Sequence, residues 1–388
     1  MNANPSQYLF HYVIIPNQIE LANLKWQTVE SWNLGIELAF LNRRINFSGD
    51  IYNKITRDIL WRNYNIPASS GFNRLAWFNG GQLQNRGWEA SVRYNVIRRE
   101  DLRLTLSLNI ARNINSFLEF PDNFNNLIGT SIGNGVYPRM AQIGQPIGSF
   151  YGFNYLGVYS TKDEAVARDA EGNIRLDSNG DPIPMRYANG YEFTAGDAIY
   201  EDVNKDGLID INDVIYLGDS NPDYTGGFGF NASWRQFSLS SHFLYRTGFD
   251  IVNEIASQTE GMLDRNNQSN AVLRRWRKEG DDFPGMLPRA YLDHPANNLG
   301  SSRYVEKGSF LRLNNLSFSY RFKQSLVSKL RIDNMELGIN LRKIWTLTAY
   351  SGQDPEISQR IDDPFWFGTD NGITPPPMVY SAFLNLVF

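Results

Sequence analysis

Hydrophobic and polar residues alternate strictly along several long segments of the chain. Between Ser31 and Phe40 the even-numbered residues are large and apolar, whereas the odd-numbered ones are small or polar. The same period of two recurs in residues 88–96, 102–110 and 335–342. Such a period predicts β-strands with one apolar and one polar face. Many of these strands exceed about 10 residues, the length that a tilted strand needs to cross a bilayer, whereas strands of soluble sandwiches average about 5–6.

The connections between the predicted strands alternate in length. We expect strands at residues 30–40, 44–62, 84–97, 102–115, 135–143, 149–160, 223–234, 236–250, 309–322, 333–350 and 378–388. Short connections are expected at 41–43, 98–101, 144–148 and 235. Outer-membrane barrels use tight turns on the periplasmic side and long loops outside. The pattern therefore predicts an all-β fold, a large antiparallel transmembrane β-barrel of which this chain holds roughly 11–12 strands, with long extracellular loops.

Composition excludes several classes of function. The formal charge of −4, without a basic block, gives no footprint for nucleic acid. Without cysteine, and with three histidines far apart, the chain lacks the residues for thiol catalysis or a histidine zinc site, and we expect no enzyme. Aromatic residues are plentiful, with 9 Trp, 20 Tyr and 24 Phe, and the Tyr and Trp among them suit membrane interfaces. No apolar run is long enough for a transmembrane helix, and the first residues lack the features of a signal peptide.

The segment DVNKDGLIDIND, residues 202–213, has the spacing of a calcium loop. Such a loop of twelve residues places oxygen ligands at regular positions and a glycine at its sharp turn. An aspartate instead of the usual glutamate at the last position predicts modest affinity, suited to a structural Ca²⁺ ion outside the cell, and we expect no other cofactor. The alternative is a turn stabilised by its own side chains, without metal. The predicted ligands are Asp202, Asn204, Asp206, the backbone carbonyl of Leu208, Asp210 and Asp213.

The C-terminal residues YSAFLNLVF predict a last strand that ends on an aromatic side chain. The residues expected to share one face of this strand are Tyr380, Ala382, Leu384, Leu386 and Phe388. This ending resembles the signal by which the barrel assembly machinery recognises outer-membrane proteins; an edge strand that ends in Phe by chance is the alternative. With a periplasmic C-terminus, counting strands backward places every long loop outside the cell.

Several segments, in their order and spacing, resemble a known family. IGQPIGSFYGFNYLGVYSTKDEA contains a Gly-Gln-Pro-Ile-Gly turn followed by an aromatic strand, and GDAIYEDVNKDGLIDINDVIYLGDSNPDYTGGFGFNASW continues from the calcium-like loop into a strand. GGQLQNRGWEASVRYN, FLRLNNLSFSYRF and YSGQDPEI resemble a hairpin, a late strand and a last external loop. Together they resemble the SusC/RagA-like TonB-dependent outer-membrane transporters over most of the chain.

The resemblance implies a plugged barrel of about 22 strands that imports large nutrients, glycans or oligopeptides. It also implies energy from the TonB complex, through an N-terminal part, and a SusD-like lipoprotein that covers the barrel. We expect this chain to be the C-terminal part of such a transporter, a fragment that needs a plug and further strands. Residues 1–29 would hold an incomplete N-terminal strand and loop, and residues 30–388 the barrel part, with extracellular insertions at 161–222 and 251–308.

A second interpretation is a secreted or surface β-rich protein that binds carbohydrate and uses calcium to hold its loops. The two interpretations differ in what the apolar strand faces contact. In a membrane barrel they contact lipid, whereas in a soluble sandwich they pack against a second sheet.

Overall fold

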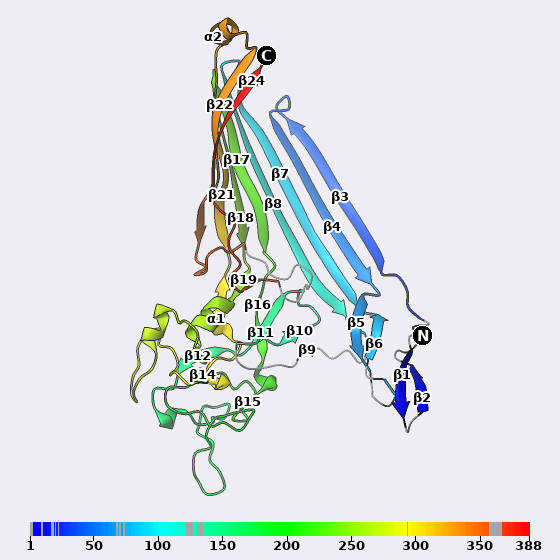
Figure 1. Ribbon diagram of the computed structural model, residues 1–388, viewed down its shortest axis with the longest axis vertical. Coiled ribbons are helices and arrows are strands. Elements are labelled where there is room, and N and C mark those ends of the chain that lie inside the picture. The colour runs from blue at the N-terminus through cyan, green and yellow to red at the C-terminus, as the bar shows by residue number, and fades with distance from the viewer. Residues whose placement is uncertain are drawn as a thin grey trace.

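A nine-stranded antiparallel sheet dominates the computed structural model (Figure 1). Each strand pairs with the next strand of the sheet along the chain, from β3 at one edge to β24 at the other. The structure describes residues 3–8, 11–16, 19, 21, 23–66, 69, 71–72, 74–121, 127–129, 135–292, 294–356 and 367–388. The nine strands are β3 (Thr28–Phe40), β4 (Ile45–Arg57), β7 (Gln82–Arg98), β8 (Leu102–Glu119), β17 (Tyr224–Trp234), β18 (Phe237–Thr247), β21 (Phe310–Arg321), β22 (Asn334–Thr348) and β24 (Val379–Val387).

One face of this sheet is apolar from edge to edge. Directly opposed residues of antiparallel strands point to the same face, so the register shows which side chains lie together. One such row across eight strands consists of Leu38, Phe47, Val92, Leu108, Phe228, Phe243, Leu313 and Trp345. These side chains have no core beneath them: Leu108, for example, is 47% exposed. Among the described residues, no second sheet covers this face. We call it the apolar face.

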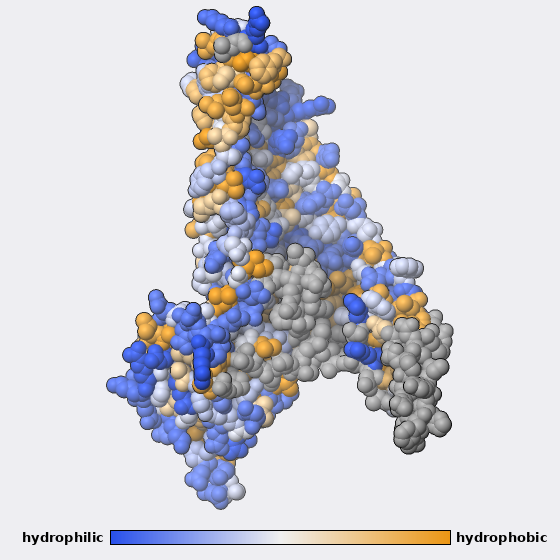
Figure 2. Space-filling view, viewed as in Figure 1, coloured by the Kyte–Doolittle hydropathy of each residue, from blue (hydrophilic) through white to orange (hydrophobic). Residues whose placement is uncertain are grey.

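The opposite face, which we call the polar face, carries hydroxyl, amide and charged side chains. A row on it contains Ser48, Ser91 and Asn109, with a hydrogen bond between the hydroxyls of Ser48 and Ser91 (2.8 Å). Asp50 and Glu89 form the adjacent pair. In Figure 2, hydrophobic residues gather over the part of the sheet nearest the C-terminus. Hydrophilic residues line the hollow between the side of the sheet that carries β3 and β4 and the side that carries β22 and β24.

Short and long connections lie at opposite ends of the sheet, as the sequence predicted (Figure 1). At one end the strands are joined by tight turns at residues 41–44, 99–101 and 235–236. The connection between β21 and β22 at the same end contains α2 (Gln324–Val327) and η7 (Ser328–Leu330). At the other end lie the four long connections: 58–81, 120–223, 248–309 and 349–378.

The connections 120–223 and 248–309 pack together, and we call their described parts the loop region. Its main core contains Phe153, Tyr187, Tyr200 and Leu299, all buried. Residues 161–222 and 251–308, the predicted insertions, fall within it. Its elements are β9 (Leu127–Gly129), β10 (Arg139–Met140), β11 (Ser149–Gly152), β12 (Tyr155–Val158), η2 (Lys162–Glu164), β13 (Arg186–Tyr187), β14 (Ala198–Tyr200), β15 (Leu208–Ile209), η3 (Ile211–Asp213), β16 (Ile215–Asp219), β19 (Asp250–Asn253), α1 (Glu254–Glu260), η4 (Asn270–Arg274), η5 (Pro295–Asn297), η6 (Ser302–Tyr304) and β20 (Val305–Lys307).

The remaining elements are two hairpins and one short strand. In the described residues, β1 and β2 pair only with each other, and so do β5 and β6, whereas β23 pairs with β19 of the loop region. No helix in the described ranges is long and apolar enough to cross a membrane. The bounds of these elements are β1 (Ala3–Tyr8), β2 (His11–Pro16), β5 (Leu60–Asn65), β6 (Arg74–Asn79) and β23 (Thr369–Asp370).

The predicted number of barrel strands is too high. The sheet contains nine strands in the described part of the chain, not roughly 11–12, because residues 135–143 and 149–160 belong to the loop region. Gly144 and Gly148 have φ of +84° and +82° and turn the chain sharply. The aromatic residues that follow, including Phe150 and Phe153, are buried. Their apolar pattern therefore serves a packed core rather than a lipid-facing strand.

Candidate functional site

The calcium-like segment lies in the loop region, between β14 and β16. It contains β15, which pairs in parallel with β13, and it ends with the helical turn η3. All six predicted ligand residues are therefore in one compact loop.

Side-chain oxygens of this loop accept hydrogen bonds from the loop's own backbone. Asp202 accepts from the amides of Asp206 (3.2 Å) and Gly207 (2.8 Å), and Asp206 accepts from the amide of Leu208 (2.8 Å). Gly207 has a φ of +87°, a left-handed conformation that glycine adopts without steric cost. The loop thus winds around its first carboxylate.

Asp213 is the most enclosed of the predicted ligands. Its side chain is completely buried and accepts from the amides of Val203 (2.8 Å) and Asp210 (2.9 Å). Asp210 in turn accepts from the amide of Asn212 (2.7 Å) at the start of η3. Burial raises the pKa of Asp213, because desolvation disfavours the charged carboxylate.

The four carboxylates of this loop form no ion pair with any Lys, Arg or His among the described residues. Oxygen donors with uncompensated negative charge fit the chemistry of a hard cation such as Ca²⁺. The carboxylates nevertheless bond to backbone amides, and in the described part of the chain no three Asp, Glu or His side chains are grouped as metal ligands. Calcium binding stays a prediction.

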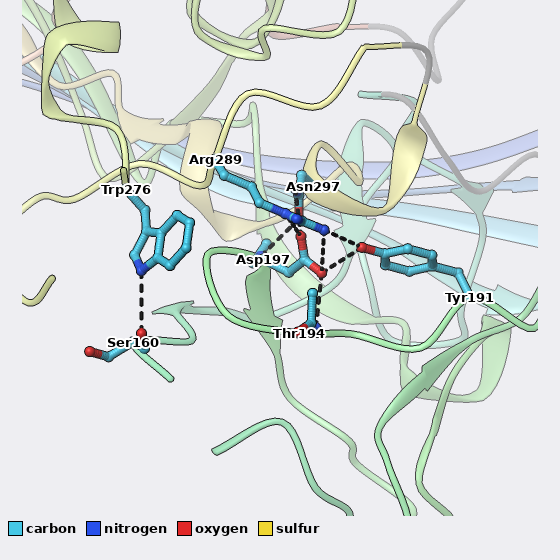
Figure 3. A network of polar contacts seen from close by, with 8 residues as sticks. Ser160, Tyr191, Thr194, Asp197, Trp276, Arg289 and Asn297 are labelled. Atoms are coloured by element: carbon cyan, nitrogen blue, oxygen red, sulfur yellow. Dashed lines mark hydrogen bonds and ion pairs between the residues drawn. The ribbon is translucent and has the colours of Figure 1, made fainter. Parts of the chain in front are cut away.

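A buried polar network joins the two long connections of the loop region (Figure 3). Asp197, which has no exposed surface, accepts hydrogen bonds from the Arg289 Nε (2.8 Å), the Asn297 Nδ2 (3.0 Å), the Thr194 amide (3.0 Å) and the Tyr191 hydroxyl (2.6 Å). Asp197, Thr194 and Tyr191 come from one connection, whereas Arg289 and Asn297 come from the other. The network therefore holds the two connections in one arrangement.

Aromatic side chains surround this network. Tyr291 stacks on the His294 ring at 4.5 Å between ring centroids, and the Arg289 guanidinium lies over the Tyr291 ring. Burial lowers the pKa of His294, which favours the neutral imidazole. Nearby, the Trp276 Nε1 donates to the Ser160 carbonyl (3.3 Å), a second link between the two connections (Figure 3).

The last long connection is held to the sheet by Arg312 of β21. Its side chain is buried, donates to the Thr346 hydroxyl (3.0 Å) and forms ion pairs with Asp354 and Glu356. Asp354 and Glu356 belong to the segment YSGQDPEI, which the sequence predicted as the last external loop. Sequence reasoning missed both this anchor and the network around Asp197, because the partners that join separate segments lie 34 to 100 residues apart.

Four of the five predicted C-terminal residues lie on one face of the last strand. In β24, Tyr380, Ala382, Leu384 and Leu386 oppose apolar residues of β22. Phe388, directly after the strand, is 80% exposed. The shared face is the apolar face of the sheet. The role of these residues as an assembly signal stays a prediction.

The polar face has an open, hydroxyl-rich surface. A hollow of about 430 Å³ near the short turns is lined in part by serines of β17, β18 and β21, and Arg103 and Glu336 also line it. Such a surface can contact a polar solute.

Comparisons with known proteins agree with this architecture. The chain is 29% identical over 377 residues to TonB-dependent receptor P3 of Formosa agariphila, with 94% of this chain and 34% of that receptor covered. It is 25% identical over 362 residues to TonB-dependent receptor SusC of Bacteroides thetaiotaomicron, with 91% of this chain and 30% of SusC covered. No protein-family model matches the chain. The chain is related to the SusC-like TonB-dependent receptors.

Solved structures support the same fold. The structure of the RagAB peptide importer in its open-open state matches all of this chain and 37% of the importer chain, with a TM-score of 0.75 at 20% identity. The chain therefore shares the β-rich fold of that structure, and the curated proteins that it resembles are TonB-dependent receptors, in agreement with the resemblance seen in the sequence. It spans about a third of the length of the curated relatives that it matches.

Proposed function

We propose that the chain forms the C-terminal part of the barrel of a TonB-dependent outer-membrane importer for large nutrients. It contributes a section of the barrel wall, the loop region and an assembly signal, and it makes or breaks no covalent bond. The plug, further strands and the contact with the TonB energising complex come from residues outside this chain.

The observation that carries this proposal is the exposed apolar face. A row of apolar side chains across the sheet, including Leu108 and Phe228, is exposed, while the other face is polar. In water such a surface would be unfavourable, whereas in lipid it is the required arrangement. A soluble carbohydrate-binding sandwich would instead cover this face with a second sheet.

The edges of the sheet support the need for further strands. β3 and β24 each have a strand partner on one side only, within the described residues. Unpaired backbone groups cannot stand exposed in lipid, because no water satisfies them there. We propose that additional strands close the barrel between these two edges.

We further propose that the C-terminus is periplasmic and the loop region extracellular. The short turns lie at the end of the sheet near the C-terminus and the long connections lie at the other end (Figure 1). Barrels of the bacterial outer membrane use short turns on the periplasmic side.

The proposed substrate is a glycan or an oligopeptide, captured with a SusD-like lipoprotein that docks on the loop region. The polar face offers hydroxyl and amide groups such as Ser91 and Asn109, which bond to polar solutes of either class. The network around Asp197 would keep the docking surface in one shape. RagAB, whose fold this chain shares, is described as a peptide importer.

We also propose that the loop of residues 202–213 binds Ca²⁺ as a structural ion. Asp202, Asn204, Asp206, Asp210, Asp213 and the Leu208 carbonyl would supply the ligands. The ion would neutralise the loop's negative charge and thereby stabilise the surface of the loop region.

Gene deletion in the native host tests the transport proposal. Deleting the reading frame that contains this chain should abolish growth on one polysaccharide or peptide mixture as sole carbon source, without affecting growth on glucose. Complementation with the intact frame should restore growth, and the protein should fractionate with the outer membrane. Recovery of the protein in a soluble fraction would overturn the proposal and favour the carbohydrate-binding alternative.

A further inference from the structure

A groove of about 440 Å³ crosses four strands at the end of the sheet near the long connections. The side chains that line it come from β3, β4, β7 and β8. Those on the apolar face by register are Trp32, Ile51, Asn53, Gln84, Arg86, Trp88, Arg112 and Ile114. The groove therefore opens on the side opposite to the polar face, away from the proposed path of the nutrient.

The groove lies where the apolar face changes from purely apolar residues to tryptophans beside polar and basic residues. Toward the short turns, the next rows of the same face are apolar, with Leu108 and Val92 as examples. In the groove, Trp32 aligns with Asn53 and Arg86, and Trp88 aligns with Arg112. Tryptophan beside polar and basic groups is typical of the membrane–water interface, where one end of the ring is in lipid and the other is wet.

Neither arginine of the groove has all of its side-chain N–H donors engaged. The side chain of Arg86 is exposed and forms no hydrogen bond or ion pair with any described residue. The Nε of Arg112 is buried and has no hydrogen-bond partner among the described residues. Its nearest carboxylate, on Asp223, is 3.8 Å from Nη2 and largely exposed, and its guanidinium lies over the Tyr224 ring at 5.4 Å. Two guanidinium groups thus line the groove with N–H donors that have no partner among the described residues.

We propose that this groove binds an anionic lipid of the outer leaflet through its phosphate group. Arg86 and Arg112 would hold the phosphate oxygens, because the guanidinium fork matches them geometrically. Trp32, Trp88 and Ile114 would contact the adjoining acyl chain. This inference rests on the proposed membrane location, but it does not depend on which nutrient is imported.

Lipid binding can be measured on the outer-membrane protein that contains this chain, reconstituted in phosphatidylcholine nanodiscs with or without phosphatidic acid. Native mass spectrometry after detergent release counts the retained lipids, and brominated phosphatidic acid reports proximity to tryptophan by quenching. We expect preferential retention of phosphatidic acid. The double variant Arg86→Gln/Arg112→Gln should weaken that retention about tenfold, which corresponds to about 1.4 kcal/mol.

Arg57→Gln is the matched control. Arg57 lies on the same face of β4, outside the groove, and is already engaged by Gln82 (2.8 Å) and Glu30 (3.3 Å). Its substitution should leave lipid retention unchanged. Equal retention of both lipids, or retention unaffected by the double variant, would overturn the proposal. Displacement of the lipid by inorganic phosphate would show a site for a free anion instead, and a co-purifying protein that shields the tryptophans would show a protein interface.

These outcomes separate this inference from the proposed function. If the protein is found in the soluble fraction, the membrane location fails and the groove has no lipid to bind. If the protein is in the outer membrane and supports nutrient uptake but shows no preference for phosphatidic acid, only the lipid site fails.

Discussion

The sheet and the loop region of this chain are stabilised in different ways. In β3 all 13 residues are exposed, and the apolar face of the sheet has no core beneath it. The loop region encloses Phe153 (1% exposed) and Leu299 (0% exposed), and its two connections share an ion pair whose carboxylate, on Asp197, is fully buried. The sheet is thus held together by strand pairing and leaves its apolar face uncovered, whereas the loop region has a core of its own.

The largest effect is expected in the loop region, from Asp197→Ala. This change leaves Arg289, Asn297 and the Thr194 amide without their shared acceptor in a buried position. Removing one partner of a buried pair costs about 3–5 kcal/mol. We expect the loop region to lose protection in hydrogen–deuterium exchange, while the nine strands keep theirs.

Glu192→Ala is the control for this experiment. Glu192 also pairs with an arginine, Arg186 (2.7 Å), but both side chains are about half exposed. An exposed pair contributes at most about 1 kcal/mol, so exchange should change little. Equal effects of the two substitutions would mean that the network around Asp197 does not hold the connections together.

The next effect is expected in the sheet, from Leu108→Arg. Leu108 lies on the apolar face, in the middle of β8. A charge at the middle of the bilayer destabilises a barrel by about 2–4 kcal/mol, whereas an exposed position in water would tolerate it. Urea unfolding in lipid vesicles measures the difference.

Ser107→Arg is the matched control, because Ser107 is the adjacent residue on the polar face, opposite Gly229 and Arg93. A small loss is expected there from the like charge of Arg93. If Leu108→Arg is no worse than Ser107→Arg, the apolar face does not contact lipid.

The sequence predicted the strands of the sheet correctly because the alternation of apolar and polar residues involves only neighbouring positions in the chain. A period of two over ten or more residues identified strands such as β3 and β8, and the short connections expected at 41–43 and 98–101 lie within one residue of the turns at 41–44 and 99–101. The prediction of a barrel strand failed at 149–160, where aromatic residues such as Phe150 and Phe153 pack inside the loop region. A local pattern cannot distinguish an apolar side chain that contacts lipid from one that contacts a neighbouring loop.

In the candidate site, too, features formed by neighbouring residues were predicted and contacts between distant residues were not. The spacing from Asp202 to Asp213 and the shared face of the last strand are local features, and the sequence contained both. The Asp197–Arg289 and Arg312–Asp354 pairs join residues 92 and 42 positions apart, and no spacing rule identifies them. The groove with Arg86 and Arg112 likewise depends on the register between strands.

A smaller effect is expected from calcium in the loop region. At a Ca²⁺ concentration about twice the dissociation constant, binding adds about 0.6 kcal/mol of stability. Limited proteolysis around residues 202–213 should therefore slow with Ca²⁺ and return to its original rate with a chelator. Asp206→Asn, which removes one exposed negative ligand, should abolish the calcium effect.

Asp177→Asn provides the comparison for Asp206→Asn. Asp177 is exposed in the same connection and likewise accepts hydrogen bonds from nearby amides. Its substitution should leave the calcium effect intact. If Ca²⁺ does not change the rate of proteolysis of the unsubstituted protein, the loop is held by its own hydrogen bonds, such as that from the Gly207 amide to Asp202.

The smallest effect on stability is expected from Phe388→Ala at the end of the sheet. Phe388 is 80% exposed and follows the last paired residue, so its loss should barely change the free energy of unfolding. If the terminal aromatic is an assembly signal, the amount of protein in the outer membrane should nevertheless fall. Val387→Ala, on the other face of β24, should not reduce it. If the amount of protein in the outer membrane falls in both variants, or in neither, the terminal aromatic is not an assembly signal. β24 would then be an edge strand defined only by its pairing with β22.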